Sequence, residues 1–517
     1  MVRSALVCLA TSVIALAACG GTKTFPSLCS AVPPPQACSM KCDPSPGAAD
    51  TCPAGFFCDP NGMCNAECTP NGGQCGSGYT CTDNGQCVST GGCTGLACQV
   101  AKCEAMGMPA TTISGQVFAP NGTLPLYGIQ VYVPNSDPGP LQAGAVCDRC
   151  SDGLPGDPIV QGTTDEDGKF SLADVPNGSN IPLVIVSGKW RRQLVLPTVN
   201  MCTDNPVGAT DTTLPKSKDD MTPDTKPGGI DMPKIAITTG SADALECLIR
   251  KLGIADKEIG TAGGSQQVAL YSDTMSGSGV GASSFAAGFA GGAGNFADAQ
   301  TLWNTQAALM TYDIVIFSCE GAQHSETKSQ AAMNAVKAYA DAGGRIFMSH
   351  WHNIWIEGAT VDGTGQAPPV WTTIATWDDG GNVNDSITDT IDEINNPKGA
   401  SFATWMLNVM GSTTRDQIPV TSARATAAGV DNTKAERWTY YQPTNAPQNF
   451  QFTTPNETDT NDRCGKVVFS DMHVSGDSTS SPGTPYPGGC ASGALTPQEK
   501  ALAFMFFDIS SCVGQIF

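Results

Sequence analysis

The sequence predicts a multidomain protein made of a disulfide-rich stalk, a small β-sandwich and a C-terminal doubly wound α/β domain. Three observations predict this division. Cysteine, glycine and proline dominate up to about residue 108, alternating apolar strands follow over 111–200, and strands alternate with helical patterns over 230–517. A chain of 517 residues is long enough for two or three domains.

The first 18 residues have the parts of a bacterial export signal. Arg3 supplies a positive start, and an apolar run over 5–16 follows it. This run is shorter than the ~20 apolar residues that cross a bilayer. The tetrapeptide Leu-Ala-Ala-Cys that ends at Cys19 resembles the lipobox of bacterial lipoproteins. The resemblance implies cleavage before Cys19, lipidation of its thiol and stable attachment to a membrane by lipid.

Residue usage agrees with an exported protein. Gly20, directly after Cys19, favours the outer membrane or cell surface by analogy with Gram-negative lipoproteins. Of the 23 cysteines, Cys8 lies in the signal and Cys19 at the lipidation site, which leaves 21. Such density is typical of disulfides outside the cytosol, and an odd number leaves at least one thiol unpaired or bonded between molecules. The net charge of −21 argues against nucleic acid as a partner.

Residues 19–108 are expected to form a cysteine-rich stalk. The segments 52–64 and 75–87 each carry three cysteines at the same spacing, with an aromatic residue ahead of the second and Asn-Gly ahead of the third. So small a unit buries little apolar area and needs disulfides. The spacing resembles tandem EGF-like modules, which implies either ligand contact or a protease-resistant spacer. Zinc is not expected here, because the region has no histidine.

Residues 111–200 are expected to form the β-sandwich. Strands are predicted at 113–118, 128–133, 169–172, 182–186 and 192–196, with turn clusters at 164–168 and 174–178. The series Ser-Gly-x-Val from Ser114, Gly-x-x-Val from Gly128, Thr-x-x-Asp-Gly-x-Phe from Thr164 and Val-Pro-x-Gly from Val175 resembles the carboxypeptidase regulatory-like domain. That resemblance implies a non-catalytic, transthyretin-like module.

Two further features belong to this region. Cys147 and Cys150 form a Cys-x-x-Cys insertion, which is either a redox pair or a local clip across a loop. In an exported protein we expect the clip. Residues 203–229 are rich in Thr, Pro, Asp and Lys, and we expect them to be a linker.

Residues 230–517 have the pattern of a doubly wound, flavodoxin-like domain. Apolar strands are predicted at 234–239, 267–271, 313–318, 345–349 and 466–470, and helices at 244–252, 299–310, 329–340 and 496–509. The glycine-rich stretch 277–294 is too long for a phosphate loop and lacks its Gly-Lys-Ser/Thr ending. Near-continuous apolar strands beside helices indicate a parallel sheet that is covered on both faces.

The histidines of the chain all follow predicted strands of this domain: His324, His350, His352 and His473. In doubly wound sheets, sites form beyond the carboxyl ends of the strands. Two carboxylates follow the same strands, Glu320 and Asp471. We therefore expect one pocket lined by the last three histidines, with both carboxylates at its rim and His324 nearby.

The order of motifs resembles the class I glutamine amidotransferase-like superfamily, in particular its ThuA-like branch. Residues 312–318 and 339–350 carry the resemblance, which covers roughly 234–350. That family places a nucleophilic cysteine in a sharp turn after the strand that here ends at His350, and this chain has Ser349, His350 and Trp351 there. The resemblance implies a fold, a carbohydrate-related ligand and a site near His350 and His352, without the glutaminase nucleophile.

Three interpretations of these residues remain open. In the first, His350, His352 and His473 bind a divalent metal together with a carboxylate, and zinc suits such donors. In the second, Cys319 is a nucleophile with a nearby histidine as its base. In the third, the pocket is non-catalytic. Six cysteines are enough for three bridges, so we expect Cys319 in a disulfide with one of Cys202, Cys247, Cys464, Cys490 and Cys512.

The preferred function from sequence is a surface-anchored lipoprotein that binds carbohydrate or a cell-envelope polymer through a pocket on the α/β domain. The alternative is an anchored, metal-dependent hydrolase of extracellular sugar or amide polymers. The sequence leaves open whether the chain is an enzyme.

Overall fold

The computed structural model describes residues 25–514 except 26, 31–32, 44–50, 60, 70–73, 77–78, 83–84, 90–92, 290–293, 360–364, 382 and 475. The predicted signal and its Cys19 lie outside these residues. By its contacts the chain divides into unit 1, Met1–Thr94, and unit 2, Gly95–Phe517. Each unit is described by itself. Among the described residues, no helix has both the length and the apolar composition needed to cross a bilayer.

Unit 1 is built from two disulfide-bonded hairpins of the same design. One pairs β1 (Phe57–Cys58) with β2 (Cys64–Asn65), and the other pairs β3 (Tyr79–Cys81) with β4 (Cys87–Ser89). Its bridges are Cys29–Cys38, Cys42–Cys58, Cys52–Cys64, Cys68–Cys81 and Cys75–Cys87. The predicted disulfide-rich character is confirmed, and the sequence repeat corresponds to a repeated pattern of bridges.

Unit 2 begins with two facing sheets. The larger has the order β12-β10-β9-β6-β7, and the smaller has β11-β5-β8. Their bounds are β5 (Thr112–Gln116), β6 (Gln130–Pro134), β7 (Pro158–Thr163), β8 (Lys169–Ala173), β9 (Gly178–Ser187), β10 (Trp190–Val199), β11 (Asp204–Pro206) and β12 (Thr225–Asp231). The predicted linker at 203–229 is therefore wrong. Its two ends form the edge strands β11 and β12, and the residues between them include the short helix α1 (Ala209–Thr212). Edge strands need no apolar alternation.

The Cys-x-x-Cys insertion does not form the expected local clip. Cys147 is bonded to Cys464, and Cys150 is bonded to Cys512. Both bridges join the sandwich part of unit 2 to its α/β part. The prediction failed because the spacing of two cysteines does not reveal partners that lie more than 300 residues away.

The α/β part contains one large sheet with the order β14-β15-β13-β17-β18-β25-β24-β23-β20-β21. The first six strands run parallel, and the remaining strands extend the sheet antiparallel from β25. The parallel strands are β13 (Ile235–Thr239), β14 (Ile259–Thr261), β15 (Val268–Ser272), β17 (Ile314–Phe317), β18 (Arg345–Ser349) and β25 (Gly465–Ser470). The antiparallel strands are β20 (Ile387–Ile391), β21 (Gln417–Val420), β23 (Glu436–Tyr441) and β24 (Ala446–Thr454).

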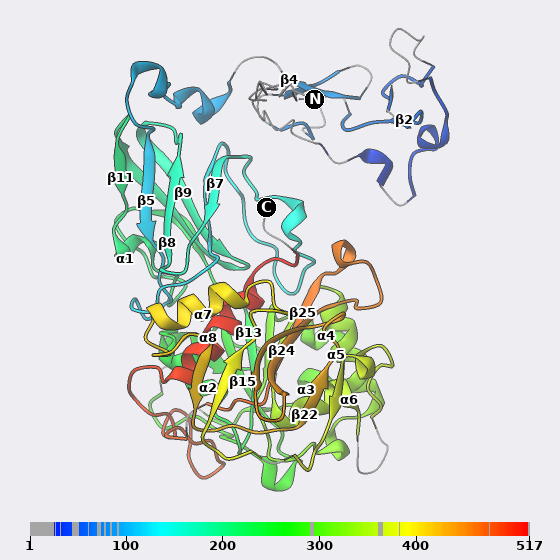
Figure 1. Ribbon diagram of the computed structural model, residues 1–517, viewed down its shortest axis with the longest axis vertical. Helices are drawn as coiled ribbons and strands as arrows, with labels where there is room; N and C mark the ends of the chain where they lie inside the picture. Colours follow the sequence, from blue (N-terminus) through cyan, green and yellow to red (C-terminus); the bar gives the residue numbers. More distant parts are fainter. Residues whose placement is uncertain are drawn as a thin grey trace, which may run out of the picture. The chain divides into compact units, whose positions relative to one another are not determined.

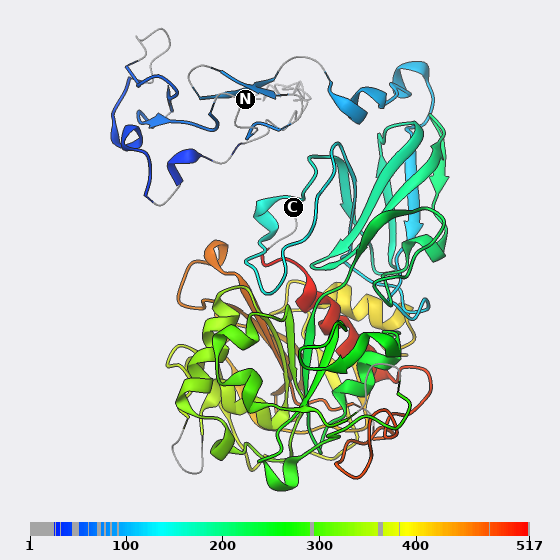
Figure 2. The ribbon, with the colours of Figure 1, turned by 180° about the vertical axis from the view of Figure 1, so that it is seen from behind.

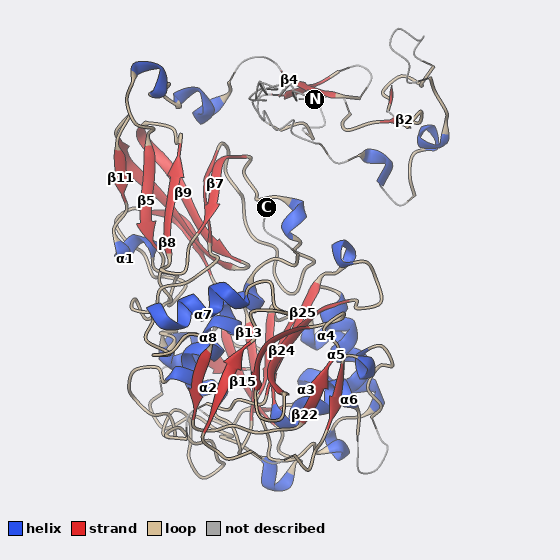
Figure 3. Cartoon of the chain, in the orientation of Figure 1, coloured by secondary structure: helices blue, strands red, loops and turns tan. Residues whose placement is uncertain are grey.

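Helices cover both faces of this sheet (Figures 1 and 2). One face packs on α2 (Leu245–Lys251), α7 (Gly399–Asn408) and α8 (Pro497–Ser510), and its core continues into the sandwich. The other face packs on α3 (Gln300–Trp303), α4 (Gln306–Leu309), α5 (Gln330–Asp341) and α6 (Ile354–Glu357). Figure 3 distinguishes the helices (blue) from the strands (red) of the sheet. The predicted helix at 299–310 is broken, because Thr305 is extended and caps α4 through its side chain.

Candidate functional site

Three side chains meet where the parallel strands end. Cys319 follows β17, His350 follows β18 and His473 follows β25. Cys319 Sγ lies 3.3 Å from His350 Nδ1, and the two histidine rings have centroids 5.1 Å apart. One donor atom from each residue lies within 4.8 Å of the others, so the three residues could hold a metal ion. We call this group the Cys-His-His cluster.

His350 occupies a sharp turn between β18 and a 3₁₀ turn at His350–Asn353. Its φ of 46° is in the left-handed region, which side chains larger than glycine seldom adopt. Such a turn costs of order 1–3 kcal/mol and is found where a side chain must project above a sheet. The turn therefore aims the imidazole at the end of the neighbouring strand, where Cys319 lies.

Cys319 is a buried, free cysteine. Its sulfur accepts hydrogen bonds from the backbone N–H groups of Gly321 (3.4 Å) and Trp351, and its own N–H donates to Ser349 Oγ at 2.9 Å. Burial raises the pKa of the thiol to about 12, so without a bound cation the sulfur stays protonated at neutral pH. The expected disulfide of Cys319 is wrong, because the other five cysteines of its group are bonded elsewhere: Cys202, Cys247, Cys464, Cys490 and Cys512.

Both histidines of the cluster are neutral. Burial lowers the pKa of His350 to about 3, and the charge of Arg424 lowers it further. Burial also lowers the pKa of His473 well below its usual value, with smaller contributions from His350 and Arg424. His473 Nε2 is buried and has no hydrogen-bond partner. Neutral imidazoles keep a lone pair available for a ligand.

His352 is not in the cluster. Its Nε2 lies 3.0 Å from the carbonyl oxygen of Ser318, and its Nδ1 accepts a hydrogen bond from Trp355 Nε1 at 3.0 Å. The ring also stacks on Phe317, with centroids 5.2 Å apart. The prediction that His350 and His352 line one pocket required an extended chain, in which both side chains point the same way. The chain instead turns at His350, which sends His352 into the core.

The remaining predicted site residues are engaged elsewhere. Glu320 forms a buried ion pair with Lys328 at 2.7 Å, and burial raises its pKa. His324 Nδ1 lies 2.9 Å from Glu326 Oε1. Asp471 accepts three hydrogen bonds, from the backbone N–H and hydroxyl of Thr426 and from the N–H of Ala427. Neither carboxylate belongs to the Cys-His-His cluster.

Sequence reasoning missed one carboxylate beside the cluster. Asp243 is buried and accepts hydrogen bonds from the Val474 N–H (2.9 Å) and from the Ser349 hydroxyl. Burial raises its pKa to about 6. It thereby links the ends of β13, β18 and β25. Its place four residues after β13 was a usable signal, because β13 lies beside β17 in the sheet.

A cavity of 660 Å³ lies between the sandwich and the α/β parts of unit 2. The sandwich contributes Tyr127, whose ring stacks on Phe504 of α8 with centroids 5.9 Å apart and an interplanar angle of 11°. Trp405 of α7 also lines it. Charged groups from the α/β part complete the lining: Lys398, Glu436, Lys466 and Asp508.

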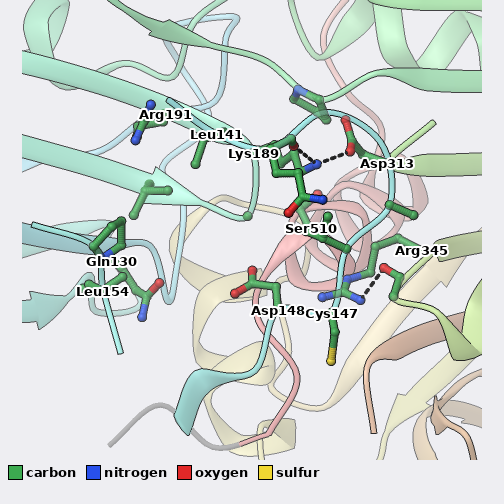
Figure 4. Close-up of a pocket in the computed structure, with 18 of the residues that line it drawn as sticks. Gln130, Leu141, Cys147, Asp148, Leu154, Lys189, Arg191, Asp313, Arg345 and Ser510 are labelled. Carbon is green, nitrogen blue, oxygen red and sulfur yellow. Dashed lines mark hydrogen bonds and ion pairs between the residues drawn. The ribbon is translucent and has the colours of Figure 1, made fainter. Parts of the chain in front are cut away.

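A second cavity, of 200 Å³, lies at the same junction (Figure 4). Lys189 of the sandwich reaches Asp313 beside β17 with Nζ to Oδ1 of 2.6 Å. Arg345 at the start of β18 donates to the carbonyl oxygens of Gly343 and Cys464. These contacts and the two long-range disulfides fix the junction around both cavities.

Comparisons with known proteins assign no family. No family model matches the chain, and no curated protein matches it. Among solved structures, two interface mutants of a type II cohesin–X-dockerin complex from Acetivibrio cellulolyticus are 17% identical. They cover 32% and 26% of this chain, and 77% and 78% of their own, with TM-scores of 0.14 and 0.16. A cytoplasmic protein from Salmonella typhimurium is 14% identical, covering 47% of this chain and 89% of its own, with a TM-score of 0.25. Scores this low assign no fold.

Proposed function

We propose that this chain is an exported, lipid-anchored protein that binds an extracellular carbohydrate or cell-envelope polymer. The disulfides of both units support a location outside the cytosol. The EGF-like, carboxypeptidase regulatory-like and ThuA-like resemblances belong to this proposal, and the last of them implies a carbohydrate-related ligand. One observation carries the proposal, namely the 660 Å³ cavity between the two parts of unit 2.

The lining of this cavity matches what a sugar presents. Ligand sites favour domain junctions and combine aromatic surfaces with a few polar groups. The face of Tyr127, half-buried on Phe504, offers an apolar platform for the C–H face of a sugar ring. Asp508 lies between Lys398 and Lys466, and both lysines form ion pairs with it. Such fixed charges give hydroxyl groups oriented donors and acceptors.

Binding tests this function directly. The mature chain would be applied to arrays of glycans and cell-wall polymers, together with Tyr127→Ala and, as a control, Ile394→Ala. Ile394 is exposed and lies outside the cavity lining. We expect at least a tenfold loss of affinity for Tyr127→Ala, which corresponds to about 1.4 kcal/mol, and none for the control. Turnover of a substrate without binding to any array member would contradict the proposal.

The anchor has its own test. In the expressing bacterium, Cys19→Ser should abolish labelling by a palmitate analogue and leave the protein unprocessed or released. Cys8→Ser changes a thiol of the same segment and should leave the label unchanged. An equal label in the Cys19 variant would remove the lipoprotein proposal without affecting the ligand proposal.

A second function is favoured by the position of the Cys-His-His cluster at the end of the parallel strands. We propose as the alternative an anchored hydrolase of extracellular sugar or amide polymers, with zinc as its cofactor. Three protein ligands leave a fourth position for water, and zinc would make that water nucleophilic at neutral pH. All three members are buried, and His350 is the most exposed of them at 8%.

Turnover separates the two functions. The mature chain would be incubated with defined sugar and amide polymers before and after chelation. Product formation that chelation abolishes and zinc restores would establish the hydrolase. Retained binding with no product under any condition would exclude it.

A further inference from the structure

Cys319 is unusual for this chain because it is not oxidised. The twenty other cysteines among the described residues are disulfide-bonded, and Cys319 alone is free there. An exported protein keeps a reduced thiol only when the thiol is sequestered or when something binds it. Burial accounts for its isolation from other cysteines. Burial does not account for the two imidazoles that are turned towards its sulfur.

The positions of these three side chains fit a single small ion. Zinc binds sulfur at about 2.3 Å and imidazole nitrogen at about 2.0–2.1 Å, which places donors of a tetrahedral site about 3.3–3.7 Å apart. The Cys319 Sγ to His350 Nδ1 distance of 3.3 Å already has this value. The third donor lies within 4.8 Å of both, so a small rotation of His473 completes the site.

One donor atom of the cluster, His473 Nε2, has no partner. His473 Nε2 is buried without a hydrogen bond, in a residue that is 2% exposed. A buried nitrogen without a hydrogen bond is unfavourable, and a bound ion would supply the missing partner. His352, by contrast, has both ring nitrogens engaged and is unsuitable as a ligand.

We propose that Cys319, His350 and His473 form a mononuclear site for a divalent transition-metal ion of the zinc type. The ligand atoms are Cys319 Sγ, His350 Nδ1 and His473 Nε2. As the sulfur–metal bond forms, the thiol loses its proton to solvent and binds as a thiolate. The site goes beyond polymer binding and does not depend on catalysis, although the zinc of the alternative hydrolase depends on it.

The surroundings suit a thiolate–metal centre. The N–H groups of Gly321 and Trp351 donate to the sulfur and stabilise its negative charge. Asp243 holds Ser349, which in turn accepts the Cys319 N–H, so the ligand backbone is fixed. The nearby cation is Arg424, and it is bound to Asp385 at 2.7 Å, which reduces its repulsion of a metal ion.

Other cysteine groups of the chain do not compete. Cys42, Cys52 and Cys64 lie close together in unit 1, as do Cys68, Cys75 and Cys81. All six are in disulfides, and a disulfide sulfur carries no thiolate charge. Among the described residues, the Cys-His-His cluster is the group with a free thiol next to imidazoles.

Cobalt titration tests the site, because a cobalt–thiolate bond gives an intense near-ultraviolet charge-transfer band. The full-length mature protein, freed of metal by a chelator, would be titrated with Co²⁺ and then with Zn²⁺. We expect one equivalent of cobalt, a thiolate band and its displacement by zinc. Cys319→Ser should abolish the band, and His473→Gln should weaken cobalt binding at least tenfold. His324→Asn, which changes a histidine outside the cluster at a left-handed position, should bind normally.

A second measurement uses the wild-type protein, so it does not depend on whether the variants fold. In the wild-type protein, zinc should protect Cys319 from alkylation during partial unfolding, and the chelator should remove that protection. A wild-type protein that binds no cobalt, or a band that persists in Cys319→Ser, would overturn the site. A wild-type protein that binds polymer but no metal would refute this inference together with the zinc-dependent hydrolase, whereas metal binding without polymer binding would refute only the polymer-binding proposal.

Discussion

Unit 1 and the α/β part of unit 2 obtain their stability from different sources. In unit 1 the strands are two or three residues long, and its buried cluster consists of the three cysteines Cys68, Cys75 and Cys87. The α/β part instead buries whole strands between two helical layers, including large side chains such as Trp303, Trp355 and Trp405. One part depends on covalent cross-links and the other on apolar burial, so a single perturbation should affect them unequally.

Reduction should produce the largest difference. With a reductant present, we expect unit 1 to lose its structure completely, because each hairpin has little apolar core without its bridges. The α/β part should keep its helical circular dichroism, since its sheet is covered on both faces. Limited proteolysis with mass spectrometry would locate the first cuts. First cleavage inside 234–350 would contradict the comparison.

The junction of unit 2 should respond to loss of its covalent links. The double substitution Cys150→Ser and Cys512→Ser should lower the free energy of unfolding of unit 2 by about 2–4 kcal/mol. The matched control is Cys29→Ser with Cys38→Ser, a bridge of unit 1 that should leave unit 2 unchanged. Urea titration followed by tryptophan fluorescence reports on unit 2, whose core contains Trp190, Trp303 and Trp438. Equal losses in both variants would show that the bridges act through general destabilisation.

A change of pH should have a smaller effect, and it should alter the stability of the α/β part more than that of unit 1. Asp389 on β20 is fully buried, and burial raises its pKa to about 8 with a smaller contribution from Asp471. In the unfolded chain this carboxyl ionises near pH 4. The folded state therefore binds the extra proton, and stability falls as pH rises from about 4 to about 8, by up to ~1.4 kcal/mol per pH unit. Unit 1 has no buried carboxylate among its described residues.

Asp389→Asn isolates this effect. The variant should gain stability relative to the wild type between pH 5 and pH 8, and the difference should level off above pH 8. Unfolding in urea at several pH values would measure it, with the exposed Asp459→Asn as control. If the difference in unfolding free energy between the variant and the wild type did not change with pH, Asp389 would not be the group that holds the extra proton.

The positions of strands were predictable because the pattern of apolar residues along the chain follows which residues are buried. The strand predicted at 345–349 coincides with β18, and the strand at 466–470 matches β25 within one residue. The predicted pocket contained two of the three cluster residues, His350 and His473, and Cys319 was named separately as a possible nucleophile. These successes depend only on strand positions and on the rule that parallel strands end at one edge.

The failures share one physical cause, which is that partner choice is non-local. His352 was expected beside His350, but one left-handed residue reversed its direction. Cys319 was expected in a disulfide, but the sandwich insertion supplies the partners of Cys464 and Cys512. Residues 203–229 were expected to be a linker, but the two ends of this stretch pair as the edge strands β11 and β12. None of these facts is encoded in neighbouring residues.

The bridges Cys147–Cys464 and Cys150–Cys512 also constrain how the protein matures. Their sequence separations are 317 and 362 residues. If the chain is exported as we propose, neither native partner is present when the sandwich first emerges. Cys147 and Cys150 are then close to each other in sequence, and we expect early oxidation to join them. Reaching the final pairing requires thiol–disulfide exchange after residue 512 has crossed the membrane. On that proposal the native bridges form only after the segments next to β25 and α8 have emerged, and we expect a disulfide isomerase to speed up their formation.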